Sequence, residues 1–167
     1  MGNDRVAVLV TGGTFDKEYN ELTGQLFFKK THVKDMLQLG RCSLKLTVRT
    51  LMMIDSLEMN GESRATILKA CKSSKQTRIV VTHGTDTMEN TAAVLGPVIK
   101  DKTVVLTGAM NPYKFGSSDG MFNLGTAIAF AQTLPHGVYV AMNGRYFAWN
   151  EVRKNRKIGM FEHKGKR

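Results

Sequence analysis

The chain has few of the features that mark secreted, membrane or metal-binding proteins. Its only 2 cysteines, Cys42 and Cys71, lie far apart and outside any metal-ligand motif, which indicates reduced thiols in or near the core. The longest apolar runs are far shorter than a membrane span, and residues 1–4 lead into a strand pattern without an apolar signal segment. We therefore expect a cytoplasmic protein that does not engage a membrane.

Acidic residues are scarce relative to basic ones. Lys and Arg total 24 against 14 Asp and Glu, which gives a formal net charge of +10. Such an excess can attract a polyanion, but the basic residues are scattered except in the stretch 153–167. Because a basic tail is usually a solvated surface, nucleic acid is not an expected partner.

The chain also lacks the glycine motifs of nucleotide-binding proteins. Thr11-Gly12-Gly13-Thr14 follows the first predicted strand, and its glycines would let backbone N–H groups approach a ligand. The turn has neither the third glycine of a dinucleotide fingerprint nor the Gly-Lys-Ser/Thr of a P-loop. A nucleotide-binding domain is therefore a disfavoured alternative.

What is present is an alternation of strand and helix patterns. Apolar strands are predicted at 5–10, 44–51, 78–82, 103–107 and 137–141, with an edge strand at 146–149. Helices are predicted at 32–39, 63–71, 88–95 and 119–131, and the basic end of the chain is predicted to be weakly structured. The alternation indicates an α/β, Rossmann-like three-layer domain with a mainly parallel sheet and helices on both faces. We expect residues 1–167 to form a single domain.

Polar residues gather where the predicted strands end. After the first four strands come, in order, Thr14, Ser56, the pair Thr85 and Asp86, and Ala109. Parallel strands place their carboxyl ends at one edge of the sheet, so these turns can share one crevice. One Thr or Asp turn is most often a helix cap, but several polar turns at one edge indicate a site for a small polar ligand.

Taken together, the motifs resemble those of the bacterial-type L-asparaginases. The stretches that carry the resemblance cover nearly the whole chain in the family's order: 11–14, 55–56, 83–89, 108–112 and 118–124. The resemblance implies hydrolysis of L-asparagine to L-aspartate and ammonia without a metal or cofactor. It also implies a short form of the family that has no C-terminal domain.

The resemblance implies catalytic roles for individual residues. Thr14 matches the nucleophilic threonine, and Thr85 and Asp86 match a second threonine and an aspartate that work with a lysine. Lys154 is the candidate for that lysine because an acidic residue and a valine precede it in the family's register. Tyr19, in the polar loop after the first turn, matches the tyrosine of a mobile loop. No counterpart can be placed for the glutamate that would partner it.

Substrate contacts follow from the same resemblance. Ser56 matches the residue that holds the α-carboxylate, Asp86 the one that holds the α-amino group, and the Ala109 carbonyl the group that receives the side-chain amide. Backbone N–H groups of Gly13 and Thr85 are expected to stabilise the oxyanion. The other expected contacts are Asp55, Leu57 and Gly84.

These roles predict a double displacement. Thr14 attacks the amide carbonyl and ammonia leaves, and water activated near Thr85 and Lys154 then hydrolyses the acyl ester. Two alternatives remain: hydrolysis of a related amide, in glutamine or linked to aminoacyl-tRNA, and non-catalytic binding of aspartate or asparagine. We expect a homodimer or homotetramer, because a lone domain leaves sheet edges and helix faces uncovered.

Overall fold

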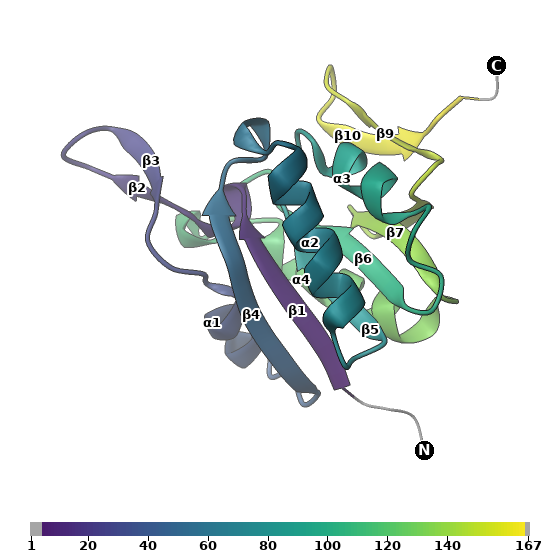
Figure 1. Ribbon diagram of the computed structural model, residues 1–167. Coiled ribbons are helices and arrows are strands. Elements are labelled where there is room, and N and C mark those ends of the chain that lie inside the picture. The colour runs from purple at the N-terminus through teal and green to yellow at the C-terminus, as the bar shows by residue number, and fades with distance from the viewer. Residues whose placement is uncertain (1–4, 166–167) are drawn as a thin grey trace.

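Six strands form the central sheet of this computed structural model, which describes residues 5–165 (Figure 1). Five of them are parallel: β1 (Arg5–Gly12), β4 (Lys45–Ile54), β5 (Arg78–Thr82), β6 (Thr103–Thr107) and β7 (Gly137–Met142). The antiparallel strand β8 (Arg145–Ala148) closes one edge, and the order across the sheet is β4-β1-β5-β6-β7-β8. All the predicted strands are present, and β4 continues three residues beyond its predicted end.

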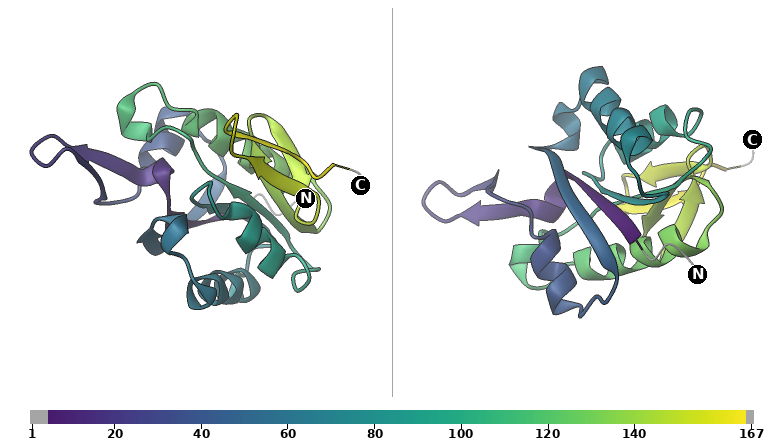
Figure 2. Two further views of the ribbon diagram at one scale, coloured as in Figure 1. Left: turned by 90° about the horizontal axis from the view of Figure 1, so that it is seen from above. Right: turned by 60° about the horizontal axis from the view of Figure 1, so that its bottom comes forward.

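Helices cover both faces of this sheet (Figure 2). On one side α2 (Gly61–Ser73) and α3 (Met88–Leu95) share a core with Ala7 and Leu9 of β1. On the other side α1 (Val33–Leu39) and α4 (Gly120–Thr133) share a second core with Val8 and Val10 of the same strand. The alternation follows from the two-residue period of a strand, and it confirms the predicted three-layer α/β fold.

The two cysteines lie in different environments, and both are free. Cys71 of α2 is buried, as predicted, and burial raises the pKa of its thiol to about 12. Cys42 is exposed after α1, so its predicted place in or near the core is wrong.

Short elements complete the edge where the parallel strands end. Single turns of 3-10 helix follow β1, β4 and β6: η1 (Thr14–Asp16), η2 (Ser56–Glu58) and η3 (Tyr113–Phe115). The stretch that contains the predicted polar loop forms a hairpin of β2 (Lys17–Asn20) and β3 (Gln25–Phe28). This β2–β3 hairpin projects from the body of the protein (Figures 1 and 2).

A second hairpin occupies the basic end of the chain, where the sequence pattern predicted little structure. It consists of β9 (Val152–Asn155) and β10 (Met160–His163). Val152 and Phe161 are both buried, and they join the core beneath α2 and α3. The prediction was wrong because these isolated apolar residues in a basic sequence gave no clear periodicity, yet tertiary packing holds them.

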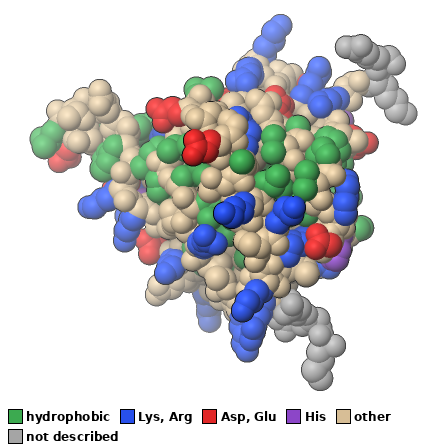
Figure 3. All heavy atoms as spheres, viewed as in Figure 1, with side chains coloured by type: hydrophobic (Ala, Val, Ile, Leu, Met, Phe, Trp, Pro, Cys, Tyr) green, Lys and Arg blue, Asp and Glu red, His purple; other side chains and the backbone are tan. Residues whose placement is uncertain are grey.

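Basic side chains are scattered over the face of the molecule that the space-filling view shows (Figure 3). On the face shown in Figure 3, lysine and arginine residues are interspersed with hydrophobic and acidic ones. Among the described residues, no helix combines the length and the apolar character needed to cross a bilayer.

Candidate functional site

Glycines allow the polar turns at the carboxyl edge of the sheet to touch. A Cβ atom on Gly13 would lie 2.4 Å from the Gly84 nitrogen, and one on Gly84 would lie 2.6 Å from Ser56 Oγ. A Cβ on Gly108 would lie 2.3 Å from the His83 carbonyl oxygen. The turns after β1, β4, β5 and β6 therefore converge, as the position of polar residues at the strand ends predicted.

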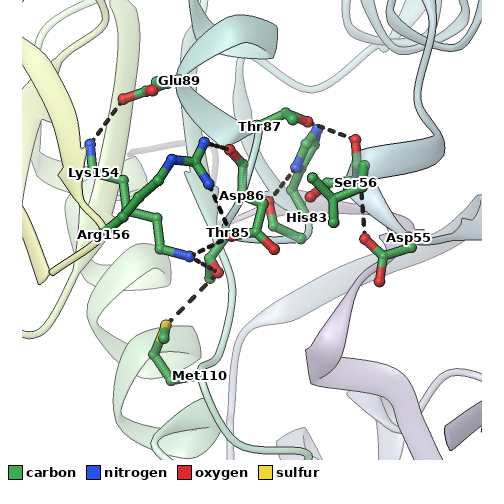
Figure 4. Close-up of polar contacts among 12 residues, drawn as sticks. Asp55, Ser56, His83, Thr85, Asp86, Thr87, Glu89, Met110, Lys154 and Arg156 are labelled. Carbon is green, nitrogen blue, oxygen red and sulfur yellow. Dashed lines mark hydrogen bonds and ion pairs between the residues drawn. The ribbon is translucent and has the colours of Figure 1, made fainter. Parts of the chain in front are cut away.

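Lys154 reaches this edge from β9. Its amine donates to Thr85 Oγ1 and to Asp86 Oδ1, at 2.8 Å in each case (Figure 4). The side chain is only 6% exposed, and the Lys154 backbone N–H donates to Glu89 Oε2 at 2.8 Å, which ties β9 to the start of α3. The Thr85 hydroxyl also lies 3.7 Å from Met110 Sδ. A buried amine in contact with a threonine hydroxyl is an arrangement suited to proton transfer.

Asp86 receives a second cation that the sequence interpretation missed. Arg156 Nη1 lies 3.4 Å from Asp86 Oδ1, and Arg156 Nη2 donates to the Asp86 backbone carbonyl at 2.8 Å (Figure 4). Arg156 lies in the turn between β9 and β10, so no helix or strand period in the sequence could have predicted this contact. Asp86 is thus held by both cations from the β9–β10 hairpin.

Thr14 and Tyr19 differ in their relation to these residues. Thr14 is half-buried and directly follows Gly13, whose backbone touches Gly84. Tyr19 is 57% exposed on the β2–β3 hairpin, and within residues 5–165 it forms no hydrogen bond with another candidate residue. The structure therefore brings Thr14 next to the converging turns and leaves Tyr19 apart from them.

The residues after β4 are held by local hydrogen bonds. Asp55 accepts the Leu57 N–H at 3.0 Å and binds the Lys17 amine through its other oxygen. Burial raises the pKa of Asp55, but these hydrogen bonds outweigh burial and lower it overall. Ser56 Oγ is buried and has no hydrogen-bond partner in the described part of the chain, so its hydrogen-bonding capacity is unused, whereas the Leu57 side chain is exposed.

His83 supports the Thr85 turn from inside the protein. Burial lowers the pKa of His83 to about 4, and the charge of Arg64 adds to this effect. Its Nδ1 lies 2.7 Å from the Gly84 carbonyl, which can only accept, so Nδ1 carries the proton. In the neutral ring Nε2 then accepts from the Thr91 hydroxyl at 2.7 Å. His83 is a structural residue of the turn.

The predicted oxyanion donors are not equally available. The Gly13 N–H donates to the Ile54 carbonyl at 3.0 Å, so it already has an acceptor in this structure. The N–H groups of Thr14 and Thr85 have no acceptor among the described residues. Gly13 contributes its close backbone approach to Gly84, and the Thr14 N–H becomes a candidate oxyanion donor together with the Thr85 N–H.

Comparison with known proteins gives a consistent result. The model of the family described as "Asparaginase, N-terminal" matches residues 5–162. An L-asparaginase from Thermococcus kodakarensis is 32% identical over 164 residues, which cover 93% of this chain and 49% of the relative. A glutaminase-asparaginase from Acinetobacter glutaminasificans is 45% identical over 84 residues, or 48% of this chain and 25% of the relative.

Solved structures give the same match at the level of the fold. The thermostable L-asparaginase from Thermococcus kodakarensis superposes with a TM-score of 0.84 at 32% identity, over 95% of this chain and 51% of that one. A probable cytoplasmic L-asparaginase from Campylobacter jejuni gives a TM-score of 0.82 at 32% identity, over 95% and 52% of the two chains. The chain spans about half the length, or less, of the relatives it matches.

Proposed function

The chain belongs to the asparaginase family, matched over residues 5–162, and we propose that it hydrolyses L-asparagine to L-aspartate and ammonia. The observation that carries the proposal is the contact of the Lys154 amine with Thr85 Oγ1 and Asp86 Oδ1. Those partners are 69 and 68 residues away in the sequence, and the amine is almost entirely buried between them. A binding protein for a small amino acid has no need of such a buried amine–hydroxyl pair.

In the proposed mechanism Thr14 attacks the side-chain carbonyl of asparagine and forms an acyl ester as ammonia leaves. The Lys154–Thr85 pair moves the proton that the nucleophile or the attacking water gives up. The N–H groups of Thr14 and Thr85, which have no acceptor among residues 5–165, stabilise the oxyanion. Water then hydrolyses the ester and releases aspartate.

Substrate binding uses the groups around this pair. Ser56 Oγ, buried and without a partner in residues 5–165, binds the α-carboxylate. The Asp86 carboxylate binds the α-amino group, and the Ala109 carbonyl accepts a hydrogen bond from the side-chain amide. Tyr19 joins the site when the β2–β3 hairpin closes over bound substrate. No metal or cofactor takes part in the reaction.

The setting of the enzyme is also part of the proposal. We place it in the cytoplasm, which agrees with the name of the similar probable cytoplasmic L-asparaginase from Campylobacter jejuni. A homodimer or homotetramer is proposed because the sheet edge at β4 and the apolar side chains on the outer surface favour coverage by a second copy.

The decisive test is ammonia release by the purified chain, measured separately with L-asparagine, L-glutamine and aminoacylated tRNA. The proposal expects turnover of L-asparagine that is abolished in Thr14→Ala. A chain that binds asparagine and releases no ammonia from any of the three would be a binding protein. Activity on aminoacylated tRNA alone would replace the proposed substrate, and near-normal turnover by Thr14→Ala would remove Thr14 as nucleophile.

A further inference from the structure

A buried amide side chain on α4 holds the turn that contains Ala109. Asn123 is fully buried, and its Nδ2 donates to the Gly108 carbonyl at 2.9 Å and to Asp119 Oδ2 at 2.9 Å. Its Oδ1 accepts the Asn143 N–H at 3.0 Å. Asn123 therefore links the turn after β6 to the turn after β7 and leaves none of its own side-chain atoms unpaired.

The neighbouring carboxylate holds the other side of the same turn. Asp119 accepts the backbone N–H groups of Met110 and Asn111, each at 3.0 Å, in addition to the Asn123 amide. Asp119 stands at the N-cap of α4 but makes no cap hydrogen bond with its side chain. Ser118 Oγ accepts the Gly120 N–H at 2.9 Å instead. The Asp119 carboxylate therefore binds the turn after β6 and does not cap α4.

These bonds fix the direction of the Ala109 carbonyl through peptide geometry. The Ala109 C=O and the Met110 N–H belong to one planar trans peptide and point in opposite directions. Because Asp119 holds the Met110 N–H, the Ala109 oxygen points away from Asp119, and it accepts no hydrogen bond within residues 5–165. Asn123 fixes the preceding peptide through Gly108, so neither plane is free to rotate.

The turn also flanks the proposed catalytic hydroxyl. Met110 Sδ lies 3.7 Å from Thr85 Oγ1, and a Cβ on Gly108 would lie 3.3 Å from Thr85 Cγ2. We infer that Asp119 and Asn123 are positioning residues that aim the Ala109 carbonyl at the leaving nitrogen, and so set the preference of the site for amides over esters. The inference rests on the proposed function and extends it to residues that do not touch substrate.

The chemistry supplies a selective readout. The NH₂ group of a side-chain amide donates to a carbonyl oxygen, whereas the alkoxy group of an ester has no proton to donate. Misdirecting the Ala109 carbonyl therefore weakens hydrolysis of L-asparagine and leaves hydrolysis of L-aspartic acid β-methyl ester unaffected. General damage to the site would lower both rates together.

The test compares kcat/KM for the amide and the ester in the wild-type chain and in Asp119→Asn. Three N–H donors converge on Asp119, and an asparagine there would present an NH₂ group to at least one of them. We expect the amide-to-ester ratio to fall about tenfold, the effect of one hydrogen bond. The matched control is Gln132→Ala, also on α4, whose side chain donates to the Ile128 carbonyl and is expected to leave the ratio unchanged.

The outcomes separate this inference from the proposed function. A wild-type chain that hydrolyses neither compound would refute both. A wild-type chain active on both, with Asp119→Asn losing both activities equally, would overturn the inference alone. Amide hydrogen exchange in the wild-type chain tests the geometry even if the variant does not fold. The Met110 and Asn111 N–H groups are expected to be protected, and exchange at the rate of an unprotected loop would overturn the inference.

Discussion

Two regions at the carboxyl edge of the sheet are built in opposite ways. The converging turns touch backbone to backbone through Gly13, Gly84 and Gly108, and Lys154 is buried among their side chains. The β2–β3 hairpin pairs only with itself within the described residues, and most of its side chains are exposed. Its base is fixed by the Lys17–Asp55 ion pair and by a 3.1 Å contact between His32 Nε2 and Glu18 Oε1.

The difference indicates a division of labour within the site. Preorganised groups stabilise a transition state because they need no reorganisation during the reaction, and in the proposed mechanism the converging turns supply such groups. Segments with few buried contacts open at low free energy and are suited to admit and enclose a ligand. We therefore expect substitutions in the turns to change both stability and activity, and substitutions on the β2–β3 hairpin to change activity alone.

The largest effect is expected for Lys154→Met, which keeps the length of the side chain and removes its donor. Loss of a group that transfers protons typically lowers kcat about 10² to 10⁴-fold, so ammonia release from L-asparagine should fall by that order. Arg153→Met is the control, because Arg153 lies next in the strand and pairs with Glu162 instead. Equal losses in the two variants would mean that Lys154 acts only through the fold of its hairpin.

The backbone contact between the turns can be broken with Gly13→Ala. The new Cβ would lie 2.4 Å from the Gly84 nitrogen at a residue with φ of +79°, so we expect a loss of more than about 3 kcal/mol in unfolding free energy. Gly116→Ala is the matched control, because Gly116 has φ of +82° and open space around it. It carries only the backbone strain, about 1–2 kcal/mol. Similar urea unfolding curves for Gly13→Ala and Gly116→Ala would show that the backbone around Gly84 moves to accommodate a Cβ at little cost in free energy.

Acid is expected to loosen the turns through His83. Its pKa is lowered to about 4 from 6.5 because burial disfavours the charged ring. Below pH 6.5 the His83 ring therefore binds a proton in the unfolded chain but stays neutral in the folded chain. The unfolding free energy falls as the pH drops from 6.5 to about 4. The shift corresponds to at most about 3 kcal/mol. Urea unfolding at pH 7 and pH 4.5 measures this, and the dependence should weaken in His83→Gln but persist in His136→Gln, at an exposed histidine.

The smallest effect on the fold is expected on the hairpin. Tyr19→Phe removes a hydroxyl from a side chain that is 57% exposed, so the unfolding free energy should change by less than about 0.5 kcal/mol. If Tyr19 closes over the substrate, kcat should still fall about tenfold or more. Leu22→Ala at the exposed tip of the same hairpin is the control. An unchanged kcat in Tyr19→Phe would show that the Tyr19 hydroxyl takes no part in the reaction.

Much of the fold could be predicted from local pattern. Apolar runs marked most of the parallel strands, and the two glycines after the first strand indicated a close backbone approach, which Gly13 makes to Gly84. Convergence of the turns followed because parallel strands end at a common edge. The identity of Lys154 as the contacting lysine rested on a resemblance, since nothing in its basic surroundings distinguishes it from a solvated lysine.

The remaining features depend on tertiary contacts that a local pattern does not contain. The β9–β10 hairpin is stabilised by the burial of Val152 and Phe161 in a core formed mainly by earlier elements. Asp119 stands at the start of the predicted helix 119–131, and only the folded turn reveals that its carboxylate accepts the N–H groups of Met110 and Asn111. The Gly13 N–H, a predicted oxyanion donor, binds the carbonyl of Ile54, which lies 41 residues away on β4 (54 − 13) and so outside any local pattern.

The lysine in contact with Thr85 is carried by the β9–β10 hairpin, which lies outside the six-stranded sheet. Within residues 5–165, β9 and β10 hydrogen-bond to each other in a separate two-stranded sheet. Detachment of the β9–β10 hairpin would withdraw the Lys154 amine from Thr85 and leave every hydrogen bond of the six-stranded sheet intact. If Lys154 has its proposed role, such a partial opening would remove activity while the six-stranded sheet stays folded.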